Sequence, residues 1–174
     1  MVIVTWPVGR RPGLVLLALV AFAAVLLPLF GYWFAGRTHP NAIAGLLPWN
    51  DAAGYYGCAL SVLDGEGLHK FCQRRPAYSL YFAGLMRAAA SELQLALVLQ
   101  AIINGAAMFV VAHAAMRRWG AAAGLVVIAA LAPFAAVMSV ATVTENLGFV
   151  LGAAGLVLVL SGAERRSSAL LVGG

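Results

Sequence analysis

Residues 14 to 36 read LVLLALVAFAAVLLPLFGYWFAG, a stretch of 23 residues without a charged side chain. A helix that crosses the roughly 30 Å hydrocarbon core of a bilayer needs about 20 apolar residues, so this stretch predicts a membrane span. It is longer than the roughly 7 to 15 apolar residues of a signal peptide, and we therefore expect an uncleaved helix. Arg10 and Arg11 precede it. Because cations favour the cytoplasmic side, we expect a cytoplasmic N-terminus.

The composition of the whole chain also indicates a membrane protein. Of its 174 residues, 63% are hydrophobic and 10% are charged, whereas a soluble domain carries about 25% charged residues. This excludes a soluble domain, a disordered chain and a small disulfide-rich secreted protein. The net charge of +5 comes mostly from arginine pairs at the ends of apolar stretches, where topology signals lie. A nucleic-acid-binding protein would gather its cations on one face, so we expect no nucleic-acid partner.

Three further stretches predict spans, at residues 93–116, 119–140 and 145–161. The last two belong to a region of 45 residues in which Glu145 is the only charge. As a helix this region would measure about 68 Å, enough for two crossings, and we expect the break close to Glu145. Residues 164–168 are expected to form a loop, and residues 169–174 to open a further apolar helix. The fold class is therefore an all-α, polytopic transmembrane bundle.

Residues 37–91 predict a polar loop between the first two spans. Within it, residues 51–63 predict a short helix with Asn50 or Asp51 at its N-cap. Residues 76–90 form a second apolar segment, with eleven residues between its flanking arginines. Eleven helical residues reach only about 17 Å.

The segment 76–90 either crosses the bilayer as a short span or lies in the interface, anchored by Tyr78, Tyr81 and Phe82. If it does not cross, the arginine pairs at 10–11, 117–118 and 165–166 all lie in the cytoplasm, as the positive-inside bias prefers. We therefore favour the non-crossing arrangement. It places the loop 37–91 and Glu145 on the external face.

Four residues are candidates for a catalytic or ligand-binding role. Asp51 follows the first span and suits a general base toward a hydroxyl, although a helix N-cap would explain it equally well. Glu145 is an isolated acid in an apolar tract, which favours a functional role over a simple interfacial turn. Together the two carboxylates could hold a divalent cation. Arg74 and Arg75 suit a phosphate at headgroup depth, or simple contact with anionic membrane lipids.

The cysteine, histidine and amide side chains are less informative. Cys58 and Cys72 both lie in the loop, where an oxidising compartment would permit a disulfide, but Cys58 could also pack alone in its helix. The three histidines, His39, His69 and His113, are scattered, so their spacing predicts no zinc site. Gln100, Asn104 and His113 lie within a predicted span and are expected to make interhelical hydrogen bonds.

A series of short motifs follows in a characteristic order along residues 14–165. They are Asn50-Asp-Ala-Ala-Gly-Tyr-Tyr, Leu63-Asp-Gly-Glu-Gly-Leu, Arg75-Pro-Ala-Tyr-Ser-Leu-Tyr-Phe, Gln100, Arg117-Arg-Trp-Gly, Ala132-Pro-Phe and Val143-Thr-Glu-Asn-Leu. In this order the chain resembles the N-terminal part of a GT-C membrane glycosyltransferase. The closest branch is the bacterial, family 39-like group related to protein O-mannosyltransferases and to the lipid A aminoarabinose transferase. It departs from the common pattern at Asn50, where many relatives have a second acid, and at Ala77, where they have a second proline.

The resemblance implies an inverting glycosyltransferase in the bacterial inner membrane. Such enzymes take a sugar from a polyprenyl-phosphate donor on the external face and pass it to a hydroxyl of a lipid, glycan or protein acceptor. By position, Asp51 would be the general base, Arg75, with Arg74 beside it, would contact the lipid phosphate, and Glu145 would position the acceptor or a divalent cation. The resemblance also implies juxtamembrane helices in the first external loop.

Members of this group usually run to several hundred residues, so we expect this chain to be the N-terminal part of a longer protein. The alternative is non-catalytic: a small multi-pass membrane protein that binds or moves a lipid-linked sugar, or an accessory subunit. Composition and predicted topology fit both, and only the order of the motifs favours the enzyme.

Overall fold

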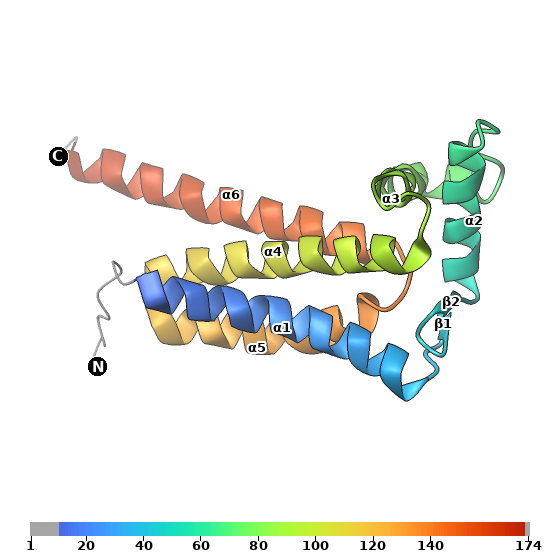
Figure 1. Cartoon of the computed structure of the whole chain (residues 1–174). Coiled ribbons are helices and arrows are strands. Elements are labelled where there is room, and N and C mark those ends of the chain that lie inside the picture. The colour runs from blue at the N-terminus through green and yellow to red at the C-terminus, as the bar shows by residue number, and fades with distance from the viewer. Residues whose placement is uncertain (1–10, 173–174) are drawn as a thin grey trace.

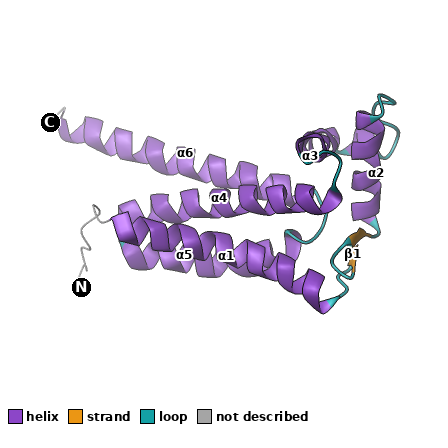
Figure 2. Ribbon diagram, in the orientation of Figure 1, coloured by secondary structure: helices purple, strands orange, loops and turns teal. Residues whose placement is uncertain are grey.

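The structure is a computed structural model, and it describes residues 11–172. Four long helices form a bundle, and two shorter helices lie across one of its ends (Figure 1, Figure 2). The long helices are α1 (Arg11–Ala35), α4 (Leu93–Trp119), α5 (Ala121–Met138) and α6 (Glu145–Val172). The shorter ones are α2 (Asp51–Leu63) and α3 (Pro76–Ala88). The predicted all-helical class is confirmed.

Small elements connect α1 to α2 and α2 to α3. A two-stranded antiparallel hairpin, β1 (Ala42–Ile43) and β2 (Leu47–Pro48), leads into α2, and a single 3-10 turn, η1 (Cys72–Arg74), leads into α3. The hairpin was not predicted from the sequence. With α2 and α3, these elements form the transverse layer at one end of the bundle.

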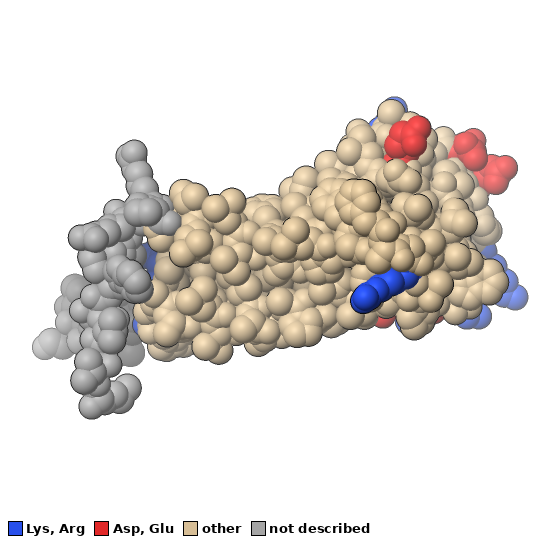
Figure 3. All heavy atoms as spheres, turned by 60° about the horizontal axis from the view of Figure 1, so that its bottom comes forward, with Lys and Arg blue, Asp and Glu red and all other residues tan. Residues whose placement is uncertain are grey.

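Each long helix contains a segment that is long and apolar enough to cross a membrane. Among the described residues these segments are Gly13–Ala35, Leu93–Trp119, Ala121–Met138 and Glu145–Gly162. They lie close to the four spans that we expected. Figure 3 shows, on one face, a broad uncharged band over the long helices, with most of the visible charged side chains at the end that carries the transverse layer and a few blue atoms at the opposite end. A multi-pass membrane protein fits these features.

Helix α4 is the centre of the bundle and packs against α1, α5 and α6. Glycine permits its closest approach to α1, because a Cβ on Gly105 would lie 2.7 Å from the ring of Phe22. Likewise a Cβ on Gly124 of α5 would lie 3.0 Å from the carbonyl oxygen of Ala112. These are small-residue contacts of the kind that membrane helices use.

Helix α3 runs crosswise to the four long helices, as Figure 1 shows in end-on view. Two of the three aromatic residues that we considered as interfacial anchors, Tyr78 and Phe82, are buried inside the protein instead. They are 2% and 0% exposed and pack against Tyr55 of α2 and Ala96 of α4. The apolar face of α3 is therefore used to hold the transverse layer on the bundle.

Helix α6 differs from the expectation at its far end. It continues as one helix through residues 164–168, where a loop was expected, so residues 169–172 end this helix instead of opening a new one. The last two residues of the expected further span lie outside the described residues. Residues 164–168 read Glu-Arg-Arg-Ser-Ser, which contains no proline or glycine to end a helix.

Candidate functional site

The backbone immediately before α2 is held in an unusual conformation. Asn50 has a φ of 51°, a region that favours glycine and in which asparagine is tolerated better than most residues. Its side-chain Nδ2 donates a hydrogen bond to the carbonyl oxygen of Pro40 at 2.9 Å. Asn50 occupies the N-cap position, but its side chain makes no capping bond. The Asn50 side chain therefore links the segment before the hairpin to the start of α2, and this link helps to set the position of Asp51.

Asp51 is the first residue of α2, and its side chain is exposed. The next residue, Ala52, is fully buried beneath the turn that connects α5 to α6. Thr142 of that turn donates a hydrogen bond from Oγ1 to the carbonyl oxygen of Ala52 at 2.7 Å. A segment 90 residues further along the chain is thus fastened to the first turn of α2.

The same turn carries Glu145, which begins α6 and is exposed. The hydroxyl of Thr144 donates to Oε2 of Glu145 at 3.1 Å and accepts a hydrogen bond from NH1 of Arg75 at 2.9 Å. Arg75 lies at the N-cap of α3 and is 69 residues away in the chain. One hydroxyl therefore links the arginine that precedes α3 to the acid that begins α6.

Three of the four predicted site residues thus lie at the same end of the bundle. Arg75 and Glu145 are linked through Thr144, and Asp51 is placed at this end by the hydrogen bond between Thr142 and the neighbouring Ala52. Arg74 ends η1 and is exposed, and it makes no hydrogen bond within the described part of the chain. All four side chains are open to solvent, so a ligand reaches them from outside.

A buried network of hydrogen bonds connects the turn between α5 and α6 to helices α3 and α4. The hydroxyl of Tyr78 donates to Oε1 of Gln100 at 2.9 Å, and Nε2 of Gln100 donates to the carbonyl oxygen of Ala141 at 3.1 Å. Asn104 donates from Nδ2 to Oδ1 of Asn146 at 2.7 Å. Gln100 and Asn104 therefore make the interhelical hydrogen bonds that we expected. The prediction was wrong for His113, which makes no side-chain hydrogen bond within the described part of the chain and stacks on Phe109 of its own helix.

Asn146, in the first turn of α6, is the hub of this network. Its Nδ2 lies within hydrogen-bonding distance of the carbonyl oxygens of Met138, Ala141 and Val143, at 3.0 to 3.1 Å. Asn146 is fully buried. These carbonyls belong to the last residue of α5 and to the turn that follows it. The amide of Asn146 adds to their backbone hydrogen bonds and fastens the turn to the first turn of α6.

Tyr78 of α3 belongs to this network, and the ring of Tyr81 lies next to it, with ring centroids 5.9 Å apart. Burial, with a smaller contribution from Tyr81, raises the pKa of Tyr78 well above its ordinary value. Burial also raises the pKa of Tyr81 to about 12. Both phenols are therefore neutral at physiological pH, and Tyr78 serves as a hydrogen-bond donor to Gln100.

On the α2 side of the site, Cys58 and Cys72 form a disulfide. The sequence permitted this bond but also permitted an unpaired Cys58. The crosslink holds η1, and with it Arg74 and Arg75, against α2. Gly54 of α2 also lets Phe71, just before η1, pack closely against α2, because a Cβ at Gly54 would collide with the Phe71 ring. The glycine of the Asp-Ala-Ala-Gly-Tyr motif thus has a packing role.

The structure also brings His69 to the two cysteines, which sequence spacing did not suggest. Within the described residues, Cys58, His69 and Cys72 are the one group of three or more metal-ligand types whose donor atoms lie within 4.8 Å of one another. The two sulfur atoms are bonded to each other. His69 lies instead with its Nε2 3.5 Å from Oγ of Ser61.

We expect the Cys58→Ser, Cys72→Ser double variant to lose about 2–3 kcal/mol of folding stability in the transverse layer, because the disulfide closes a loop of about 14 residues. Limited proteolysis of the detergent-solubilised protein would show faster cleavage between α2 and α3, with the long helices still protected. Equal protection of the variant and the parent would contradict this expectation.

Comparison of the chain with protein-family models, with curated proteins and with solved structures finds no match in any of the three. The arrangement of the residues therefore carries the functional argument by itself.

Proposed function

We propose that this chain is the N-terminal, donor-binding part of an inverting glycosyltransferase that uses a polyprenyl-phosphate sugar on the external face of a bacterial inner membrane. The observation that carries the proposal is the position of Asp51, Arg75 and Glu145 at the same end of an apolar bundle, although they are far apart in the chain. A lipid-linked sugar presents its phosphate and sugar at this depth, with its apolar chain in the bilayer.

The crosswise position of α3 supports the non-crossing topology. With α3 in the interface, the first residues of α1 and α5 and the last residues of α4 share one side of the membrane, and Asp51, Arg75 and Glu145 share the other. The arginine pair at 117–118 then lies on the cytoplasmic side, as the positive-inside bias favours.

In the proposed reaction Asp51 accepts the proton of the acceptor hydroxyl. The oxygen attacks the anomeric carbon of the donor sugar, the bond from that carbon to the phosphate oxygen breaks, and the polyprenyl phosphate leaves. Arg75 offers guanidinium hydrogen bonds to the phosphate as its charge grows, with Arg74 beside it. Glu145 is held by Thr144 at the edge of this site and orients the acceptor.

Two exposed carboxylates are oxygen donors of the kind that a hard divalent cation takes. If the activity depends on such a cation, Asp51 and Glu145 are the residues that would hold it, and the cation would neutralise charge on the donor phosphate. The steps assigned to Asp51 and Arg75 do not depend on it.

The direct test is sugar transfer by the full-length protein, reconstituted in vesicles with a radiolabelled polyprenyl-phosphate hexose and a cell-envelope extract as acceptor. The proposal expects label in the acceptor fraction and inversion at the anomeric carbon. Tight donor binding with no transfer to any acceptor would instead support the non-catalytic, lipid-sugar-binding alternative. No donor binding would overturn both.

Arg75→Gln is expected to weaken binding of a short-chain polyprenyl phosphate by about 10- to 100-fold, because a charge-assisted hydrogen bond is worth about 1.5–3 kcal/mol. Binding would be measured by native mass spectrometry in detergent. Thr144→Val is the matched control, since it removes the Arg75 hydrogen bond but keeps the guanidinium. An equal loss in both variants would mean that Arg75 acts through the turn and does not contact the phosphate.

A further inference from the structure

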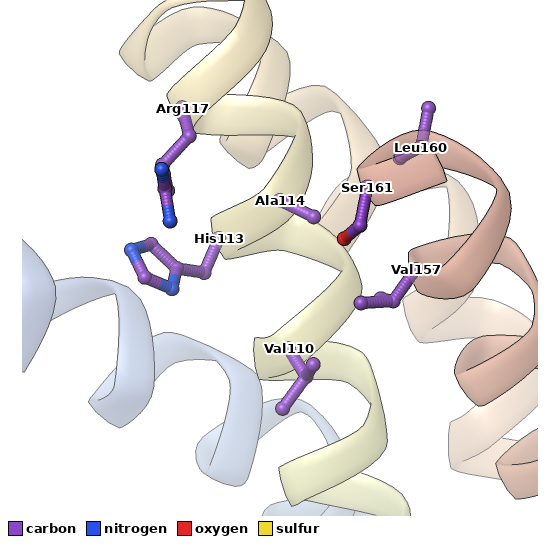
Figure 4. A pocket seen from close by; sticks show the side chains of 7 residues that line it. All are labelled: Val110, His113, Ala114, Arg117, Val157, Leu160 and Ser161. Carbon is purple, nitrogen blue, oxygen red and sulfur yellow. The ribbon is translucent and has the colours of Figure 1, made fainter. Parts of the chain in front are cut away.

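A second polar site lies at the opposite end of the bundle from the transverse layer. A cavity of about 130 Å³ opens between the last turns of α4 and the corresponding part of α6. Its lining consists of Val110, His113, Ala114, Arg117, Val157, Leu160 and Ser161 (Figure 4). It is separate from the site at Asp51, which lies where α2 begins.

Charged residues mark the end of the apolar stretch near the cavity on both helices: Arg117 and Arg118 on α4, and Glu164 and Arg165 on α6. In a membrane-spanning bundle this pattern places the cavity where hydrocarbon gives way to headgroups. Helix α6 also diverges from α4 toward this end (Figure 1), which opens the space between them to the lipid.

The polar groups of the lining are all able to donate hydrogen bonds. Figure 4 shows Arg117 and His113, one turn apart on α4, with the guanidinium directed toward the imidazole, while the hydroxyl of Ser161 points from α6 toward α4. The imidazole is held by a stacking contact with Phe109, with ring centroids 5.8 Å apart. The other lining residues are apolar, and none of the lining residues is acidic. Such a lining suits a phosphate group joined to apolar chains.

Arg118 shows that not every cation at this end faces the cavity. Its guanidinium carbon lies 5.5 Å from the centre of the Trp119 ring, in a cation–π contact, and it does not line the cavity. The two adjacent arginines therefore have the same charge and nearly the same depth but different surroundings.

We propose that this cavity binds the headgroup phosphate of an anionic phospholipid. The phosphate would accept hydrogen bonds from Arg117 and His113, and the acyl chains would lie along the open apolar face of α6. Leu158 and Val159 on that helix are 73% and 68% exposed. Basic pockets between membrane helices are the usual binding sites of anionic headgroups. The proposal is independent of the sugar-transfer function.

The test is native mass spectrometry of the delipidated full chain, titrated with phosphatidylglycerol or with phosphatidylcholine. We expect preferential binding of phosphatidylglycerol, weakened about fivefold by Arg117→Gln, which corresponds to about 1 kcal/mol for one cation at the membrane surface. Arg118→Gln, of equal net charge, is expected to change binding by less than about twofold. Circular dichroism would verify that both variants keep their helix content.

Three outcomes would overturn the proposal. Equal losses in the two arginine variants would show non-specific attraction of anionic lipid to the end of the bundle. Displacement of the lipid by inorganic phosphate at equal concentration would make the ligand a free anion. Glu164 follows Ser161 by three residues on α6, and if Glu164→Gln abolished the effect of Arg117→Gln, that effect would come from an ion pair within the protein.

Discussion

Asp51→Asn in the full-length protein is expected to lower the rate of sugar transfer by about 10²- to 10⁴-fold, the usual contribution of a positioned general base. Asparagine has the size of aspartate but cannot take a proton from the acceptor hydroxyl. The loss should therefore appear in kcat, with binding of the donor nearly unchanged, because the proposed phosphate contacts come from Arg75 and Arg74. Transfer would be measured with the labelled polyprenyl-phosphate hexose in vesicles.

The fold should tolerate this change. Asp51 is exposed, and its side chain makes no hydrogen bond or ion pair within the described residues, so its removal leaves no buried partner unsatisfied. The carboxylate sits in the first turn of α2, where its interaction with the helix dipole is worth about 0.3–1 kcal/mol. A fall in activity of several orders of magnitude would far exceed that cost.

Asp64→Asn supplies the matched control. Asp64 is also exposed, belongs to the same transverse layer and lies at the C-cap of the same helix. It changes the net charge equally but stands at the far end of α2 from Glu145. Equal loss of transfer in both variants would show a general effect of charge or folding, and unchanged transfer in Asp51→Asn would remove Asp51 from the mechanism.

The sequence was sufficient to predict the elements that depend on local composition. Long uncharged stretches marked the membrane helices, and α2 begins at Asp51 and ends at Leu63, as its pattern indicated. The prediction was wrong at the end of α6. Residues 164–168 are charged or serine and resemble a loop, but they contain no proline or glycine to break the helix. The hairpin of β1 and β2 was missed because two-residue strands have no periodicity to detect.

The sequence offered the candidate site residues as a list, but it did not predict their arrangement. Nothing in the spacing of Arg75 and Thr144 indicates that they are bonded, and the position of Thr142 under α2 depends on how two distant segments pack. Asn146 had a signal in the sequence, since a polar amide next to the single acid of a long apolar tract needs a partner. Its role as the hub of a network became visible only with the turn before α6 in place.

Asn146→Ala is the second change with a large expected effect, and it should lower the free energy of unfolding by about 2–4 kcal/mol. It removes several hydrogen bonds at once from a buried position, and each is worth about 0.5–1.5 kcal/mol net. The carbonyls of Met138, Ala141 and Val143 would lose the Asn146 side-chain amide and keep their backbone hydrogen bonds, and Ala141 also keeps its bond from Gln100. Asn104 would keep only its longer contact, 3.4 Å to Ser139.

Asn104→Ala is the matched variant for this prediction, and it should cost less, about 1–2 kcal/mol, because only its bonds to Asn146 and Ser139 are lost. It removes the bond between the two amides, at 2.7 Å, but Asn146 keeps its contacts to the turn. Denaturant unfolding in detergent micelles would measure both. Because the amide of Asn146 holds the turn that carries Thr144, Asn146→Ala should also weaken polyprenyl-phosphate binding, and Asn104→Ala should not. Equal destabilisation by the two variants would mean that the network stabilises the helix contacts in general and does not specifically hold the turn against α2.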